Sequence, residues 1–153
     1  MNKEKIKIEE PTKQFGVEQL VMLPCPYCGG KIELRDSSII YGRSYGNVYI
    51  CENYPKCDAF VGTHHGKTKP LGTLADGRLR NKRKETHSLF DQLWKGEKKT
   101  MSRGKAYRYM AEILNIEQER AHIAMLTYEE CNKLIGELLR ARQHNGLQIT
   151  CER

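Results

Sequence analysis

The chain has 153 residues, 39% of them hydrophobic, and a formal net charge of +7, which fits one domain of ordinary size or two small ones. No apolar run approaches the ~18 residues that cross a bilayer, and residues 1–14 lack the apolar segment of a secretory signal. We therefore expect a cytoplasmic protein that does not act at a membrane. Its modest core would benefit from a bound metal.

Most of the positive charge lies in the middle third of the chain. Residues 67–108 hold thirteen Lys or Arg and four Asp or Glu, whereas residues 1–66 are neutral overall and residues 109–153 have two more acidic than basic residues. A concentrated basic stretch predicts binding to a polyanion, in particular nucleic acid. The alternative interpretation is a solvated helix face that promotes solubility.

Residues 1–16 contain Pro11 and alternating charges, which predict a mobile N-terminus. Residues 17–62 are predicted to form a compact β unit. An apolar lead-in, VEQLVML, opens this unit, and KIELR then alternates between apolar and polar residues. Two further apolar runs, SIIYG and NVYIC, flank the turn-forming GRSYGN, and AFVGT could add a short strand.

Four cysteines organise this β unit. Cys25 and Cys28 form a C-x2-C pair, and Cys51 and Cys57 form a C-x5-C pair after an interval of 22 residues. Two such pairs, each in a short turn and joined by a hairpin, provide the four thiolates of a tetrahedral zinc site. Because sulfur fills all four positions, we expect one structural Zn²⁺ ion and a zinc ribbon. Two disulfides or unligated thiols are the alternatives, and the lack of a secretory signal disfavours disulfides.

A helical unit at residues 76–139 is predicted after a linker, residues 63–75, that is rich in Gly, Thr and Pro. The first helix has Leu79, Phe90, Leu93 and Trp94 on its apolar stripe, RLRNKRK on its outer face, and Gly96 as its stop. We expect the apolar stripes of the helices to pack on one another and on one face of the ribbon.

Capping residues define the later helices. A second helix begins after Ser102 and ends at Asn115, and the capping box Thr127-x-x-Glu130 opens a third, while residues 116–126 are ambiguous. Residues 140–153 are predicted to be a polar tail that frays. The sequence therefore predicts an α+β protein, an antiparallel zinc ribbon followed by a small bundle of three to four helices.

Residues 23–62 resemble the C-terminal four-cysteine zinc ribbons of type IA DNA topoisomerases. Those ribbons read CP-x-CGG, a variable hairpin and then C-x-x-YP-x-C, and this chain has CPYCGG and CENYPKC. The resemblance implies binding to single-stranded DNA by stacking of bases on aromatic residues, for which Tyr45, Tyr49 and Tyr54 are the candidates. The alternative for all three tyrosines is packing within the ribbon. Strand cleavage is not implied, because the resemblance does not include a catalytic domain.

The layout of the whole chain is similar to that of small phage and prophage proteins known as zinc-finger-containing proteins. The segments that carry this similarity are residues 70–75 (PLGTLA), 90–94 (FDQLW), 101–116 and 121–131. The similarity implies a phage or prophage origin and brings no established activity.

The function predicted from these features is non-enzymatic binding of nucleic acid, of DNA more than RNA, with weak sequence specificity and a preference for single strands. The candidate phosphate contacts are Lys56, Lys67, Lys69, Arg78, Arg80, Lys82, Arg83 and Lys84. The alternative is a protein-interaction module that binds a host factor, such as RNA polymerase or a defence protein, with a purely structural zinc. A nuclease built on His64, His65, His87 or His122 is a third and weaker hypothesis.

Overall fold

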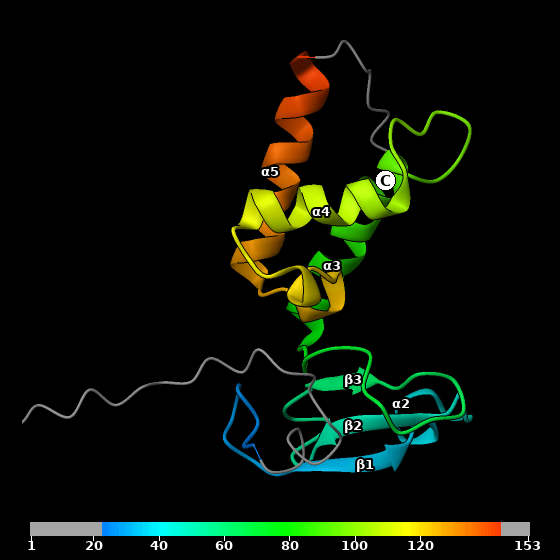
Figure 1. The fold of residues 1–153 in the computed structure, drawn as a ribbon. Helices are drawn as coiled ribbons and strands as arrows, with labels where there is room; N and C mark the ends of the chain where they lie inside the picture. Colours follow the sequence, from blue (N-terminus) through cyan, green and yellow to red (C-terminus); the bar gives the residue numbers. More distant parts are fainter. Residues whose placement is uncertain (1–22, 145–153) are drawn as a thin grey trace, which may run out of the picture.

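A computed structural model describes residues 23–144, which form a small sheet at one end and a group of helices at the other (Figure 1). This arrangement confirms the predicted α+β class. The predicted N-terminus, residues 1–16, and residues 145–153 of the predicted tail lie outside the described residues. The strands and α-helices are β1 (Ile32–Asp36), α2 (Ser38–Tyr41), β2 (Asn47–Cys51), β3 (Phe60–Gly62), α3 (Gly77–Phe90), α4 (Arg103–Leu114) and α5 (Tyr128–His144).

The sheet is antiparallel in the order β1-β2-β3. Tyr49 is opposite Leu34 in β1 and Val61 in β3, so these three side chains share one face, whereas Ile50 and Phe60 are paired on the other face. The SIIY run, which the apolar pattern grouped with the β segments, forms the single-turn helix α2 instead. This helix lies within the connection between β1 and β2.

Local capping signals place the helices where the sequence predicts them. The Asp76 carboxylate accepts a hydrogen bond from the Leu79 N–H at the start of α3, and the Ser102 hydroxyl accepts one at the start of α4. Asn115 ends α4 in the left-handed conformation with φ of 50°. A 3-10 turn, Asp91–Leu93, extends α3, and the ambiguous stretch contains two more, Gln118–Arg120 and Ile123–Met125.

Helix α5 begins at the predicted capping box and extends further than expected. The Thr127 hydroxyl accepts from the Glu130 N–H at 3.2 Å, and the Glu130 carboxylate accepts from the Thr127 N–H at 2.9 Å. The helix continues to His144, so the prediction that the chain frays from residue 140 is wrong for residues 140–144. Arg142 explains the extension, because its buried guanidinium donates to the carbonyl of Leu89 in α3.

The described residues contain two separate hydrophobic cores. The ribbon core lies on the Tyr49 face of the sheet and comprises Cys25, Ile32, Tyr49, Cys51, Ala59, Val61 and Leu74. The helical core is larger and includes Phe90, Met110, Leu114, Ile123, Leu126, Leu134 and Leu138. We expected the helical stripes to pack on a ribbon face as well, but the two cores do not merge. No helix within residues 23–144 has both the length and the apolar character needed to span a membrane.

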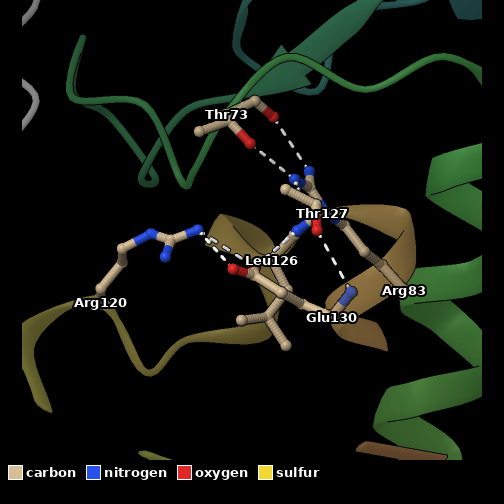
Figure 2. A network of polar contacts seen from close by, with 6 residues as sticks. All are labelled: Thr73, Arg83, Arg120, Leu126, Thr127 and Glu130. Atoms are coloured by element: carbon tan, nitrogen blue, oxygen red, sulfur yellow. Dashed lines mark hydrogen bonds and ion pairs between the residues drawn. The ribbon is translucent and has the colours of Figure 1, made fainter. Parts of the chain in front are cut away.

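Polar contacts of Arg83 join the two cores (Figure 2). The guanidinium donates to the Thr73 carbonyl at 2.9 Å and to the Thr73 hydroxyl at 2.6 Å, and it donates twice to the Leu126 carbonyl at 3.0 and 3.2 Å. Residues 72 and 73 also contact the helical unit through backbone, because the Thr73 N–H donates to the Ala124 carbonyl at 3.0 Å. A Cβ at Gly72 would clash with that same carbonyl, so only glycine fits there.

A second set of contacts fixes the start of α3 against the ribbon. Asp58 follows Cys57, the last cysteine of the ribbon. It accepts hydrogen bonds from the Gly77 N–H at 3.0 Å and from the Arg80 guanidinium at 3.1 Å. Arg80 also donates to the carbonyls of Ala75 and Asp58, both at 2.6 Å. Leu74 and Ala75 are themselves buried, and Ala75 bridges to Phe60, so the segment predicted as a linker is packed against the sheet.

The contacts of Arg83, Arg80 and Asp58 between the ribbon and the helical unit form what we call the junction. They predict that substitutions of two neighbouring cations of α3 have different effects on stability. Arg83→Gln would leave the carbonyls of Thr73 and Leu126 without their buried donor, at a cost of roughly 2–4 kcal/mol in unfolding free energy. Lys84→Gln changes an exposed side chain and should alter this free energy by less than about 0.5 kcal/mol. Thermal unfolding followed by circular dichroism measures both, and equal melting temperatures for the two variants would contradict the structural role of Arg83.

Candidate metal centre and aromatic surface

The first cysteine pair is in a tight turn before β1. The Gly29 N–H donates to the Cys25 carbonyl and the Cys25 N–H donates to the Gly30 carbonyl, both at 2.8 Å. Gly29 has φ of 77°, a left-handed conformation that a side chain disfavours. Gly30 is equally restricted, because a Cβ there would lie 2.7 Å from the Asn53 side-chain nitrogen. The CGG sequence thus places Cys28 beside the second cysteine pair.

The second pair follows from the end of β2. Cys51 is the last residue of the strand, and the Tyr54 N–H donates to its carbonyl at 3.0 Å to begin the turn. The Cys57 N–H donates to the Asn53 carbonyl at 3.0 Å, which returns the chain toward the first pair. Pairing of Ile32 with Cys51 in the sheet then brings the two turns together.

The four sulfur atoms form one cluster. All four lie within 4.8 Å of one another, with Cys25 3.7 Å from Cys57 and Cys28 3.3 Å from Cys51. A tetrahedral zinc ion with Zn–S bonds of ~2.3 Å requires sulfur–sulfur distances of about 3.8 Å. The geometry therefore fits a Cys₄ zinc site with little movement of the side chains. Within residues 23–144 this is the one group of three or more such side chains close enough to bind a metal.

Hydrogen bonds around the sulfurs favour the thiolate form of the exposed ligand. The Asn53 side-chain amide donates to the Cys28 sulfur at 3.3 Å, and this bond, with that from the Gly30 N–H, lowers the pKa of Cys28 to about 6. Burial raises the pKa of Cys51 to about 12, which a bound cation would reverse. The N–H groups of Asn53 and Ala59 donate to the sulfurs of Cys51 and Cys57, and so help to orient them.

The predicted structural zinc is consistent with this donor set. Cys25, Cys28, Cys51 and Cys57 would hold one ion and supply all four of its ligands. A zinc ion that polarises a substrate or activates water keeps one position open, and four thiolates fill every position. The chemistry that the ion supplies is thus a crosslink between the two turns, which stabilises the small ribbon core.

The three candidate aromatic residues have different environments. Tyr45 is 62% exposed in the connection between β1 and β2, and Tyr54 is half-buried in the second cysteine turn. Tyr49 is fully buried, and its hydroxyl donates to the Thr68 carbonyl at 2.7 Å. The predicted stacking role of Tyr49 is therefore corrected, because no ligand can contact its ring. The alternation of β2 points it into the ribbon core.

Tyr45 and Tyr54 lie at the two ends of a row of aromatic rings that is formed by residues from separate parts of the sequence. Ring centroids are 5.6 Å apart for Tyr45 and Tyr41, 6.5 Å for Tyr41 and Phe60, and 6.5 Å for Phe60 and Tyr54. We call these four residues the aromatic row. Tyr41 is 55% exposed, and Phe60 is partly exposed on the face opposite Tyr49. The alternation of Phe60 and Val61 in β3 is the signal that could have placed Phe60 there.

The basic residues of α3 are largely occupied by contacts within the protein. Arg83 is 8% exposed, so its predicted phosphate contact is corrected to the junction role described above. Arg80 stacks on Phe60 at 3.8 Å while it bonds Asp58, and Lys82 pairs with Glu85 at 2.9 Å. Arg78 lies over the Tyr128 ring at 3.8 Å but keeps an exposed side chain, as does Lys84.

Three further candidate lysines are exposed but do not form one surface. Lys56 lies in the second cysteine turn, close in sequence to Tyr54. Lys67 and Lys69 flank Thr68, whose carbonyl covers the Tyr49 hydroxyl, so they belong to the opposite side of the ribbon from Phe60. Lys67 and Lys69 are thus on the other side of the ribbon from Arg80, which stacks on Phe60.

The histidines considered for a nuclease are partly brought together. His64, His87 and His122 line one hollow of about 550 Å³ with Glu117 and Glu119. Unlike the sulfur atoms of the four cysteines, the ligating atoms of these side chains do not lie close enough together to form a metal-binding group.

Metal removal should unfold the ribbon core and leave the helical core folded. Chelation, or the substitution Cys51→Ser, removes a ligand set that the ribbon core needs, whereas the helical core has its own packed interior. We expect the protein to release one zinc ion, measured with a colorimetric chelator, and to keep most of its far-ultraviolet helical signal. Cys131→Ala changes a buried thiol of the helical core and is the matched control, which should retain zinc. Zinc retained in Cys51→Ser would contradict the site.

Comparisons with known proteins agree with this metal centre. No curated protein and no solved structure matches the chain. The model of one family, described as a zinc-finger-containing domain, matches residues 21–141, which include all four cysteines and the helical unit. Since the match covers most of the chain, the protein belongs to the family of zinc-finger-containing domains.

Proposed function

We propose that this protein is a non-enzymatic nucleic-acid-binding protein that binds single strands through the aromatic row of its zinc ribbon. The observation that carries the proposal is the row itself, four neighbouring rings of which Tyr41 and Tyr45 are more than half exposed. Exposed aromatic rings are surfaces on which single bases can stack, each stacked base contributing ~1–3 kcal/mol.

Cations beside the row suit the same ligand. The Arg43 guanidinium lies 4.7 Å from the centre of the Tyr45 ring, and Lys56 is exposed near Tyr54. A strand whose bases stack on the rings would carry its phosphates within reach of such side chains. The overall charge of +7 favours the approach of any polyanion and makes the affinity depend on salt.

A preference for single strands follows from the chemistry of stacking. The flat faces of bases in a duplex are covered by neighbouring base pairs, so a row of rings can contact them only after the bases unstack. Stacking contacts the flat faces of bases and does not read their edges, which favours weak sequence specificity. DNA is the more favoured ligand, in keeping with the resemblance of the ribbon to those of type IA topoisomerases, and we extend the proposal to a phage or prophage origin.

A second candidate function is a protein-interaction module that binds a host factor. The observation that favours it is a cleft of about 760 Å³ between the first cysteine turn and the helical unit, with an apolar lining that includes Tyr27, Ile32, Leu79, Leu126 and Tyr128. Binding through such a surface would depend little on salt, whereas affinity for a nucleic acid falls steeply as salt rises.

The aromatic row predicts which tyrosines matter for binding. The double variant Tyr41→Ala/Tyr45→Ala should bind a fluorescent single-stranded DNA oligonucleotide roughly tenfold or more weakly, because two stacking surfaces are lost. Tyr27→Ala removes a tyrosine that is 43% exposed but lies outside the row, and it should bind like the unaltered protein.

Fluorescence anisotropy across a salt series, with single-stranded and duplex DNA and RNA in parallel, measures these affinities. Equal losses of affinity for single-stranded DNA in Tyr41→Ala/Tyr45→Ala and in Tyr27→Ala would contradict the proposal. The proposal would also be wrong if the protein bound single-stranded DNA, duplex DNA and RNA no more tightly than a neutral polymer.

A further inference from the structure

A loop at the end of the helical unit away from the sheet carries basic residues that are not among the predicted phosphate contacts. Residues 94–101 connect the 3-10 turn that follows α3 to the start of α4. They lie on the side of the helical unit opposite the ribbon (Figure 1). The loop is held at its base, because the N–H groups of Thr100 and Met101 both donate to the Leu93 carbonyl, at 2.9 and 3.0 Å. Gly96, with φ of 83°, turns the chain outward.

The charge of this region is strongly positive and exposed. We call Lys95, Lys98, Lys99, Arg103 and Lys105 the distal basic patch; all five are exposed, and Glu97 is the single acidic residue among residues 95–105. Lys95 pairs with Asp91 at 3.1 Å. The other four cations make no ion pair within residues 23–144, unlike Arg80 and Lys82 of α3.

Aromatic side chains lie within the patch. The Arg103 guanidinium lies 4.6 Å from the centre of the Tyr107 ring and 5.4 Å from that of Trp94, and the Lys95 amine lies 4.6 Å from the Trp94 ring. Such contacts hold the cations near an apolar surface and leave their charge available to an anion. Trp94 is the one tryptophan of the chain, so its fluorescence reports on this patch alone.

We propose that the distal basic patch is a second nucleic-acid contact, which holds the phosphate backbone of the strand whose bases occupy the aromatic row. This inference rests on the proposed function. The patch supplies more free cations than α3. Arg80, Lys82 and Arg83 are used in the junction or in an ion pair, which leaves Arg78 and Lys84 as the exposed cations of that helix. Sequence-independent phosphate contacts of this kind add affinity without reading bases.

The distance between the two surfaces sets the length of ligand that can reach both. Helix α3 has 14 residues, which at 1.5 Å per residue is about 21 Å along its axis. A strand of about 20 nucleotides in a helical conformation spans about 70 Å, at about 3.4 Å per nucleotide. Such an oligonucleotide is long enough to follow the protein from the ribbon to the patch.

The test uses the zinc-loaded full chain and a labelled single-stranded DNA oligonucleotide of that length. The variant Lys98→Gln/Lys99→Gln should bind roughly tenfold more weakly at moderate salt and reduce the slope of log affinity against log salt by about 1.4. Lys133→Gln/Arg140→Gln removes the same charge from exposed positions of α5 and should change the slope little. In the unaltered protein, DNA should change the Trp94 fluorescence, and this change should diminish in Lys98→Gln/Lys99→Gln.

The readouts separate this inference from the proposed function. Loss of binding in Tyr41→Ala/Tyr45→Ala, with an unchanged slope in Lys98→Gln/Lys99→Gln and a silent Trp94, would overturn the second contact and leave the ribbon site standing. Equal slopes in the two charge variants would also overturn it, because net charge alone would then explain the effect. A Trp94 response to poly-glutamate but not to DNA would assign the patch to acidic proteins and overturn the inference.

Discussion

The closure of four sulfur atoms around one position is the constraint on which the rest of the ribbon depends. The strands have five residues or fewer. The large side chains of the ribbon core are Ile32, Tyr49, Val61 and Leu74. So small a core supplies little stabilisation by burial alone. A Zn²⁺ crosslink between the two cysteine turns supplements it and fixes the end of β2. The second turn also positions Tyr54 at one end of the aromatic row and Asp58 at the junction with α3.

The junction explains why charge in the sequence is a poor guide to the binding surface. Arg80 and Arg83 belong to the most basic run of the chain, yet their guanidinium groups are used to satisfy carbonyls and a carboxylate between the two cores. Arginine suits this role, because its five donors can bond several acceptors at once in a buried site. The exposed positive charge is therefore greatest at the far end of the helical unit.

The sequence predicts the features that depend on neighbouring residues. Cysteine spacing identifies the metal site, and Ser102, Asn115 and the Thr127–Glu130 box mark helix ends, because a cap needs only the residues within one turn. Tyr49 and Arg83 are different, since their burial depends on Thr68, Thr73 and Leu126, which are distant in sequence. The aromatic row likewise joins a short helix, a strand and a cysteine turn. Even so, the spacing of Leu79, Arg83, Thr86 and Phe90 places Arg83 on the inner stripe of α3.

The ribbon depends on one zinc ion that is held by sulfur alone. X-ray absorption at the zinc edge of the purified full chain measures it most directly, because it reports the number and type of atoms bound to the metal. We expect one zinc per chain with four sulfur neighbours at ~2.3 Å and no nitrogen or oxygen ligand. A nitrogen or oxygen atom in the coordination shell, or a ribbon core that folds without bound zinc, is the opposite result.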